Sequence, residues 1–333
     1  MLILSQSDVE RLLPMKACID VMAATLAGLA RGEAVLPLRT VIAIPNTTDA
    51  FAVMPAYLGS PRSLGAKVIT VYPGNHGTRF DSHQGAVLLF DPDNGSLAAV
   101  LEASAVTTIR TAAVTAVATR ALSRENSSTL AMIGSGVQAV AHLESLCLVR
   151  PIKSVRVWSR NRDHARALVT LAGERFALDG SVADTCAAAV ANADIVLTST
   201  SAREPVLNGD WLTPGTHVNA IGASQASARE LDSTAVARSR LYVDRRESAL
   251  NEPGDILVPL REGRITPDHI VGEIGEVLIG RAPGRGADDE ITLFKSLGLA
   301  IEDLAAASFV YDEAVRTGAG TRVELGGTRH AAH

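Results

Sequence analysis

The stretch Leu130-Ala-Met-Ile-Gly134-Ser-Gly136-Val-Gln-Ala139 decides the fold of much of this chain. An apolar strand runs directly into Gly-x-Gly-x-x-Ala, and helix-forming residues follow, which is the layout of a dinucleotide-binding turn. Gly134 would permit the tight turn, Gly136 would let backbone amides approach a pyrophosphate, and Ala139 would let the helix pack closely on the sheet. The residues expected to contact the dinucleotide here are Gly134, Gly136, Val137 and Gln138.

A second apolar strand, residues 154–158, follows at the spacing of such a domain and ends in Ser159-Arg160-Asn161. A cofactor with free ribose hydroxyls typically pairs with an Asp or Glu about 20 residues after the glycine motif, whereas a 2′-phosphate is bound by Arg and small donors. The alternative is a solvated basic helix start, although cations there oppose the helix dipole. We therefore predict that Ser159, Arg160 and Asn161 hold a 2′-phosphate and that the cofactor is NADPH.

Composition and charge limit the class of protein. The 333 residues suffice for two domains, and a net charge of −5 lacks the basic excess of a nucleic-acid binder. There is no run of about 18 apolar residues and no basic segment followed by an apolar core at the N-terminus, so we expect no membrane span, no signal peptide and a cytoplasmic location. Cys18, Cys147 and Cys186 are far apart without His or Cys companions, which favours reduced thiols over disulfides or a metal site.

Hydrophobic periodicity predicts the order of the elements. We expect a helix over residues 15–31, short strands over 38–44, 51–57, 64–72, 86–90 and 97–101, and a helix over 104–122. After the two nucleotide strands, a helix over 161–173 and strands over 194–200, 216–222 and 240–244 are expected, followed by a last helix over 293–316 that packs on the first domain. This alternation predicts an α/β fold, a Rossmann-type doubly wound and mainly parallel sheet.

Three cations occupy positions where the pattern predicts burial. Lys67 alternates with aliphatic residues along its strand, Arg110 lies on an apolar stripe early in its helix, and Arg39 falls within the apolar run 38–44. A buried cation without a partner is costly, so three together predict an anion brought in from outside. For each cation taken alone, an internal ion pair or a side chain that reaches solvent remains the alternative.

A substrate that carries a carboxylate would satisfy these cations. Arg39 and Arg110 would act as bidentate clamps, and Lys67 would be a compact donor near the reacting atom. When hydride is delivered to a C=N carbon, the nitrogen must receive a proton, which a lysine can supply or relay. Lys67, Arg110 and Arg39 are therefore the predicted catalytic residues.

Over nearly its whole length the chain resembles the ornithine cyclodeaminase/mu-crystallin family. The marks of the resemblance are Pro37-Leu-Arg39, Gly65-Ala-Lys67, Ser82-His83-Gln84-Gly85, Ile109-Arg110-Thr111, Gly134-Ser-Gly136, Asn219-Ala-Ile-Gly222, Arg229-Glu-Leu-Asp232, Glu273-Ile-Gly-Glu276 and Phe294-Lys295-Ser296-Leu-Gly298. The resemblance implies an α+β substrate-binding and dimerisation domain built from residues 1–121 and 302–325, an NADP-binding domain at 122–301, and a homodimer. The end of the chain is rich in Gly, Thr, Arg and His, and we expect a loose tail at 326–333.

The resemblance also implies that Arg39, Lys67 and Arg110 line a substrate pocket beside the nicotinamide. It places Thr198, Thr200, Ile221, Ser296 and Gly298 at the ribose or nicotinamide. Hydroxyl side chains at strand ends are, however, often satisfied by the backbone. His83 and Gln84 are further candidates for contacting the nicotinamide or the substrate, with a surface or backbone-bonded place as the alternative.

The segment after Gly222 bears on the reaction. Cyclodeaminases of this family carry Gly-Ala-Asp-x-Pro-Gly-Lys, whereas this chain has Gly222-Ala-Ser224-Gln-Ala-Ser-Ala. Ser224 is a candidate substrate contact, but without a partner it cannot act as a base near neutral pH, which counts against ornithine cyclisation.

The mu-crystallin-like branch implies NADPH-dependent reduction of a cyclic imine that bears a carboxylate, such as Δ1-piperideine-2-carboxylate or Δ1-pyrroline-2-carboxylate, to the L-amino acid. The alternatives are reductive amination of a 2-oxo acid, an opine-type condensation, ornithine cyclodeamination, and a crystallin-like protein that only binds NADPH or another ligand. Retention of Lys67 beside two arginines favours an enzyme over a binding protein.

Overall fold

The computed structural model describes residues 1–75 and 77–327. The chain divides into two compact units: unit 1 comprises residues 1–110 together with the chain from 299 onward, and unit 2 comprises residues 111–298. The sequence-based expectation put these junctions at 121/122 and 301/302. The tail expected at 326–333 lies mostly outside the described residues.

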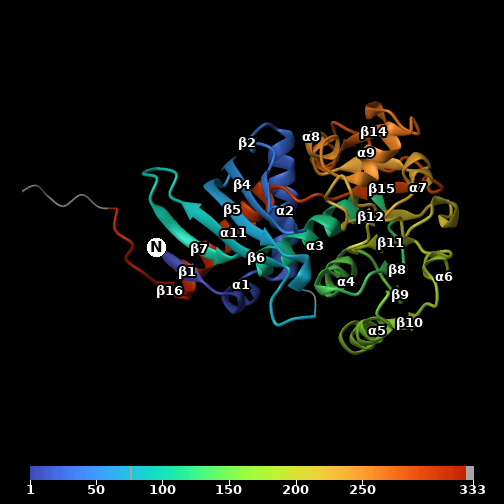
Figure 1. Ribbon diagram of the computed structural model, residues 1–333, viewed down its shortest axis with the longest axis horizontal. Helices are drawn as coiled ribbons and strands as arrows, with labels where there is room; N and C mark the ends of the chain where they lie inside the picture. The colour runs from blue at the N-terminus through green and yellow to red at the C-terminus, as the bar shows by residue number, and fades with distance from the viewer. Residues whose placement is uncertain (76, 328–333) are drawn as a thin grey trace, which may run out of the picture. The chain divides into compact units, whose positions relative to one another are not determined.

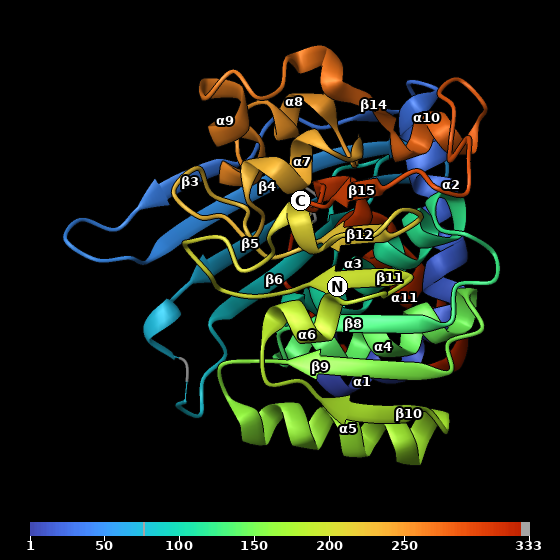
Figure 2. The same cartoon turned by 90° about the vertical axis from the view of Figure 1, so that its right-hand side faces the viewer.

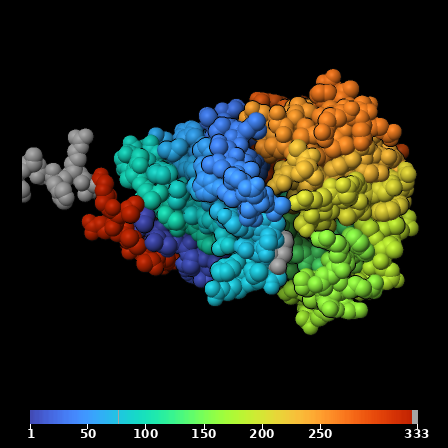
Figure 3. Space-filling model, viewed as in Figure 1, coloured from blue at the N-terminus to red at the C-terminus, as the bar shows by residue number. Residues whose placement is uncertain are grey.

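Unit 1 contains an eight-stranded sheet with the order β16-β1-β7-β6-β5-β4-β2, in which β3 also pairs with β4. Its strands are β1 (Leu2–Leu4), β2 (Ala34–Val35), β3 (Thr40–Ala43), β4 (Ala50–Gly59), β5 (Arg62–Val71), β6 (His83–Phe90), β7 (Leu97–Glu102) and β16 (Thr321–Arg322). The two ends of the chain meet where β1 pairs antiparallel with β16, so the dark-blue start and the red end lie side by side in Figures 1 and 3.

The helices of unit 1 are α1 (Gln6–Leu12), α2 (Met15–Ala30), the beginning of α3 (Ala103–Leu122), α11 (Ala300–Thr317) and the short η1 (Pro73–Asn75). Helix α11 packs on α2, β4, β5 and β6. A Cβ added at Gly65 of β5 would lie 2.8 Å from Leu304 Cδ1 of α11. Because side chains alternate along a strand, Lys67 lies on this same helix-covered face of β5.

Two expected elements of unit 1 are corrected. The helix expected over 293–316 begins only at Ala300, because the run Thr292–Lys295 is strand β15, fully buried in the sheet of unit 2. Short buried apolar runs fit strand and helix equally well, and Gly298 with φ of +76° separates the two elements. The strand expected over 38–44 is β3, whose four residues are all exposed, and Arg39 precedes it.

Unit 2 contains a second eight-stranded sheet, with the order β10-β9-β8-β11-β12-β15-β13-β14 and parallel pairing throughout. Figure 2 shows β11, β8, β9 and β10 side by side. The strands are β8 (Thr129–Ile133), β9 (Ser154–Trp158), β10 (Asp179–Val182), β11 (Ile195–Thr198), β12 (His217–Ala220), β13 (Arg240–Val243), β14 (Ile270–Glu273) and β15. The chain winds outward in both directions from β8 and β11, so their carboxyl ends form the switch point where such sheets bind ligands.

Two apolar clusters fill unit 2 against the parallel sheet. Its helices are α4 (Val137–Val149), α5 (Arg162–Phe176), α6 (Cys186–Val190), α7 (Ser233–Ala237), α8 (Arg246–Ala249), α9 (Gly254–Arg261) and α10 (Ile274–Leu278), with the short η2 (Gly209–Trp211) and η3 (Pro267–His269). The expected doubly wound sheet and the second α+β unit built from both chain ends are confirmed. In the part of the chain that the structure describes, no single helix is long and apolar enough to cross a bilayer; only α1 and α2 taken together, bent by 83°, pass that test.

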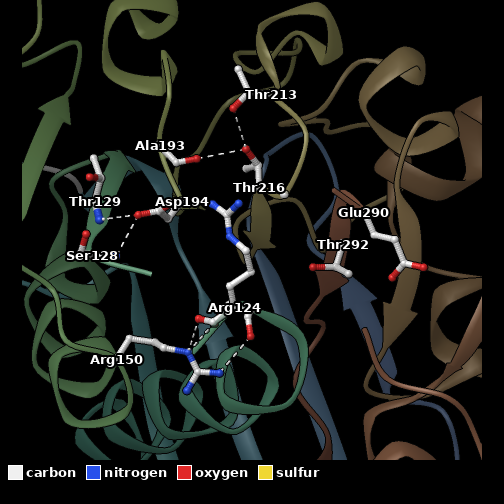
Figure 4. Close-up of polar contacts among 12 residues, drawn as sticks. Arg124, Ser128, Thr129, Arg150, Ala193, Asp194, Thr213, Thr216, Glu290 and Thr292 are labelled. Carbon is white, nitrogen blue, oxygen red and sulfur yellow. Dashed lines mark hydrogen bonds and ion pairs between the residues drawn. The ribbon is translucent and has the colours of Figure 1, made fainter. Parts of the chain in front are cut away.

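Hydrogen bonds and ion pairs of polar side chains hold the amino ends of the strands in unit 2 in place (Figure 4). The guanidinium of Arg150 donates to three carbonyls at the end of α3, those of Thr119, Arg120 and Ser123, where a cation complements the negative end of the helix dipole. The Asp194 carboxylate accepts the backbone amides that begin β8 and a 2.6 Å bond from Arg124. These contacts fix the amino edge, while the carboxyl edge carries the expected ligand-binding residues.

Candidate functional site

The turn after β8 has the geometry of a phosphate cradle. Gly134 has a φ of +112°, and a Cβ there would lie 2.5 Å from the Ser199 carbonyl oxygen, so only glycine fits this close approach between the segments after β8 and β11. Gly136 is the N-cap of α4, has no side-chain cap, and faces open space at its Cβ position. Ala139 is fully buried against the sheet. The first amides of α4 therefore point at a place that an anion can occupy.

Buried polar atoms at this turn also fit a bound dinucleotide. Within the described residues, Gln138 Oε1 and Ser199 Oγ are buried without a hydrogen-bond partner. Buried polar atoms are nearly always paired in native proteins, so both atoms indicate a missing ligand or water. Val137, an apolar residue, is 71% exposed at the first position of α4. The residues present thus fit a phosphate-bearing cofactor lying across the turn.

The end of β9 keeps a basic side chain available beside this turn. Arg160 is exposed and donates at 3.3 Å to the Oγ of Ser201, a residue that the sequence analysis did not name. Asn161 is the N-cap of α5, because its Oδ1 accepts the amides of Asp163 and His164. Its oxygen is therefore committed, and only its amide nitrogen is left for a phosphate. Ser159, rather than a carboxylate, ends the strand region.

The carboxyl ends of β11 and β12 are held by a buried acid. Thr198 Oγ1 donates to Glu230 Oε2 at 2.9 Å and is fully buried, so its expected contact with the cofactor is corrected to a supporting role. The amides of Thr200 and Gly222 donate to the same carboxylate, both at 2.6 Å. Thr200 and Ile221 are half-buried and stay predicted contacts.

The segment after β15 is held in a similar way. Asp244 Oδ2 accepts the amides of Leu297 and Gly298, and Ser296 is almost fully buried. Glu230 and Lys295 entered the sequence analysis only as marks of a resemblance, and Asp255 was not named there. Lys295, a charged residue at the end of an otherwise apolar strand, was the signal that could have pointed to this region.

Lys67 and Arg110 of unit 1 meet two acids at the start of α11. Lys67 Nζ lies 2.7 Å from Asp303 Oδ2, and Arg110 Nε lies 2.8 Å from Asp303 Oδ1. Arg110 Nη1 lies 2.8 Å from Glu302 Oε2. All four side chains are at most 4% exposed. The premise that these cations lack an internal counter-charge is therefore wrong, and so is the view of Arg110 as a free bidentate clamp.

These acids escaped sequence reasoning because the expected last helix was one continuous element. In the structure the helix begins at Ala300, which puts Glu302 and Asp303 in its first turn, where carboxylates complement the helix dipole. Glu302 Oε2 also accepts the amide of Leu299 and so caps the helix. The catalytic assignments of Lys67, Arg110 and Arg39 stay predictions.

The electrostatics of the cluster suit proton transfer. Burial lowers the pKa of Lys67 to about 8; Asp303 opposes this shift, whereas Arg110 and Arg39 reinforce it. The pKa of the Asp303 carboxyl is lowered, because Arg110 and Lys67 outweigh the effect of burial. Arg39 is half-buried, and its charge reaches Lys67. A lysine that exchanges its proton near neutral pH is suited to general acid–base work.

The remaining predicted residues occupy more open places. His83 and Gln84 are exposed at the start of β6; His83 Nδ1 is bonded to Ser82 Oγ, and Gln84 Nε2 donates to the Asp81 carbonyl. Ser224 is half-buried in the segment after β12. Within residues 1–75 and 77–327, no group of three or more metal-ligating side chains converges.

Comparison with known proteins gives consistent matches. The sequence matches the ornithine cyclodeaminase/mu-crystallin family over residues 1–318. It is 41% identical over 297 residues to the ketimine reductase mu-crystallin of Mus musculus, covering 88% of this chain and 91% of the mouse protein. The structure of Thermococcus litoralis Δ1-pyrroline-2-carboxylate reductase in complex with NADH and L-proline aligns with a TM-score of 0.95 at 39% identity, covering 97% of this chain and 100% of that one. An archaeal alanine dehydrogenase dimer with bound NAD aligns with a TM-score of 0.92 at 32% identity, covering 98% and 99%.

Proposed function

Because the chain belongs to the ornithine cyclodeaminase/mu-crystallin family, we propose that it reduces a carboxylate-bearing cyclic imine to the corresponding L-amino acid with hydride from a nicotinamide dinucleotide. The substrates we propose are Δ1-pyrroline-2-carboxylate and Δ1-piperideine-2-carboxylate. The observation that carries the proposal is the buried contact of Lys67 with Asp303 on the helix-covered face of β5, where burial lowers the pKa of the ammonium to about 8 against the opposing effect of Asp303. Unit 2 is the nucleotide-binding part, and unit 1 binds the substrate.

The proposed reaction balances with one hydride and one proton. A bound reduced nicotinamide supplies the hydride, which forms a C–H bond at C2 while the C=N π pair moves to nitrogen. The Lys67 ammonium gives its proton to that nitrogen and becomes a neutral amine, which solvent later reprotonates. Asp303 holds the ammonium in place and favours its charged form. In the reverse direction the neutral amine of Lys67 accepts the proton.

The ion pairs change the roles that we propose for Arg39 and Arg110 in binding the substrate carboxylate. Arg110 is held by Glu302 and Asp303, so it contributes a fixed positive field and orients Asp303. Arg39 lies outside any strand and is half-buried, and its charge reaches Lys67. We propose that Arg39 makes the main ionic contact with the substrate carboxylate, and that the fixed positive charge of Arg110 strengthens this contact.

We propose NADPH as the preferred cofactor. The support is local: Ser159, Arg160 and the amide nitrogen of Asn161 offer donors at the end of β9, where a carboxylate would repel a phosphate. The Thermococcus relative was solved with NADH, so relatives of this fold also accept the unphosphorylated cofactor. The proposed preference of this chain for NADPH therefore depends on Arg160.

We propose a homodimer built through the sheet of unit 1. The residues on β4, β5 and β6 that point away from α11 are apolar and only half-buried or exposed, a pattern typical of interaction surfaces. They include Val53, Pro55, Tyr57, Leu64, Val68, Leu88 and Phe90. The alanine dehydrogenase relative is a dimer, which supports the same assembly here.

Reductive amination of a 2-oxo acid is the second candidate, because the alanine dehydrogenase relative aligns over nearly the whole chain. The test measures NADPH and NADH oxidation with the two cyclic imines, with 2-oxo acids plus ammonia or methylamine, and with ornithine. We expect oxidation with a cyclic imine alone, without added amine. Turnover only when an amine accompanies a 2-oxo acid would transfer the assignment to reductive amination.

Lys67→Met tests the proton donor. Because the ammonium is lost while the nucleotide unit is untouched, kcat should fall by about 10²-fold or more and NADPH affinity should change little. Undiminished kcat in the folded variant would remove Lys67 from the mechanism.

A further inference from the structure

A chain of buried charged residues joins three strand ends of unit 2 at their carboxyl edge. Lys295, the last residue of β15, has its Nζ 3.0 Å from Asp255 Oδ2, and both side chains are 0% exposed. Asp255 lies in the first turn of α9, and its Oδ1 accepts the amides of Glu230 and Leu231 at 2.8 and 2.9 Å. The ion pair thereby fixes the backbone that carries Glu230.

Glu230 continues the chain toward β11 and β12. Its carboxylate accepts the amides of Thr200 and Gly222 and the hydroxyl of Thr198. A Cβ at Gly222 would lie 2.3 Å from the Thr200 carbonyl oxygen and 2.5 Å from the Glu230 carboxyl group, so the two segments pack as closely as glycine allows. One carboxylate thus sets the relative position of the segments after β11 and β12.

Stability alone does not explain this arrangement. Burying ions costs free energy, and well-packed apolar residues of similar volume often do as well or better. The pKa of Glu230 is raised, because burial and the charge of Asp255 outweigh Lys295 and the two bonded amides, which lower it; the lysine therefore favours the charged carboxylate against these effects. A charged carboxylate holds amides more firmly than a neutral one.

The location of these buried charged residues indicates their function. In a doubly wound sheet the dinucleotide lies across the carboxyl ends of the strands at the switch point. The Gly134–Gly136 turn and Arg160 occupy the β8 and β9 side of that edge, whereas Thr200 and Gly222 follow β11 and β12 on the other side.

We propose that Lys295, Asp255 and Glu230 are positioning residues that fix the backbone of Thr200 and Gly222 to receive the nicotinamide-ribose half of the cofactor. This inference rests on the proposed function, since it assumes a dinucleotide. It assigns the three residues no contact with the cofactor. Their loss should weaken binding of the whole dinucleotide and leave binding of its adenine half intact.

The experiment compares two ligands on three variants. Lys295→Met removes the counter-charge, and Glu230→Gln keeps the shape of the side chain but sets an amide N–H against backbone N–H groups. Arg285→Met is the matched control: it breaks bonds to the carbonyls of Leu122 and Glu290 in the same unit, at the amino edge of the sheet. NADPH and adenosine 2′,5′-bisphosphate, which is the adenine half alone, are titrated against each protein.

We expect Lys295→Met and Glu230→Gln to raise the Kd of NADPH about tenfold or more, a loss of about 1.4 kcal/mol, and to change that of adenosine 2′,5′-bisphosphate by less than about twofold. Hydrogen exchange of the apo protein should quicken at Thr200 and Gly222 in both variants and stay unchanged there in Arg285→Met. Equal loss of both ligands, or unchanged NADPH affinity and exchange, would overturn the inference while the proposed function stands. A wild-type protein that binds no nicotinamide dinucleotide would overturn both.

Discussion

Replacing Asp303 with Asn removes a carboxylate that contacts both Lys67 and Arg110. The Lys67 pKa of about 8 is the result of burial and two arginines that lower it against Asp303, which raises it. Without Asp303 the opposing effect is gone, so the pKa of Lys67 must fall. Because the ammonium is the proposed proton donor, imine reduction by the variant should require lower pH.

The size of this shift follows from the geometry. For unit charges about 4 Å apart at an effective dielectric constant of about 20, Coulomb's law gives about 4 kcal/mol. One pH unit corresponds to about 1.4 kcal/mol, so this energy corresponds to about three pH units, and relaxation around the new amide reduces it. We expect the alkaline limb of kcat/KM, near pH 8 in the wild type, to move down by about one to three pH units.

The assay is the pH profile of kcat/KM for cyclic imine reduction, with one substrate for all variants so that its own ionisation cancels. Asp303→Glu keeps the charge and should keep the limb near that of the wild type. Glu302→Gln removes the carboxylate that pairs with Arg110 Nη1 but leaves Asp303 against Lys67, so its limb should move less. A folded Asp303→Asn protein with the wild-type limb would refute the reasoning. Loss of one partner of a buried ion pair should also cost about 3 to 5 kcal/mol of stability, measurable by urea unfolding.

Two further predictions concern unit 2. Arg160→Gln should raise the Kd of NADPH about tenfold and leave that of NADH within about twofold, because a charge-assisted bond to phosphate contributes about 1.5 to 3 kcal/mol. Arg162→Gln, which loses only an exposed ion pair with Asp184, is the control, and an equal effect of both changes would remove Arg160 from the phosphate site. Arg150→Met should lower the free energy of unfolding by about 3 kcal/mol, because several carbonyls at the end of α3 lose their donor. A loss below about 1 kcal/mol in urea unfolding would mean that water replaces those bonds.

Local patterns predicted much of the fold of both units. The glycine turn, the strands that flank it and the short strands of unit 1 depend on interactions between near neighbours in the sequence, which periodicity reports directly. Gly134 is the clearest case: its expected tight turn appears as a φ of +112° with no room for a Cβ.

The long-range ion pairs could not be predicted in the same way. Arg110 and its partners are separated by 192 and 193 residues, and no local pattern states which acid a buried cation will meet. The incorrect prediction for residues 293–299 also concealed these acids. One continuous helix was expected there, whereas the structure has a strand followed by a separate helix. The argument from burial found Lys67 and Arg110 but supplied the wrong counter-charge.

Transfer of deuterium from nicotinamide labelled at C4 tests the central claim most directly. When the labelled reduced cofactor and a cyclic imino acid are incubated with the protein, we predict one deuterium at C2 of the amino acid product, detected by mass spectrometry and NMR. An amino acid product without deuterium at C2, or no consumption of either cyclic imine by a protein that binds the cofactor, would contradict the account.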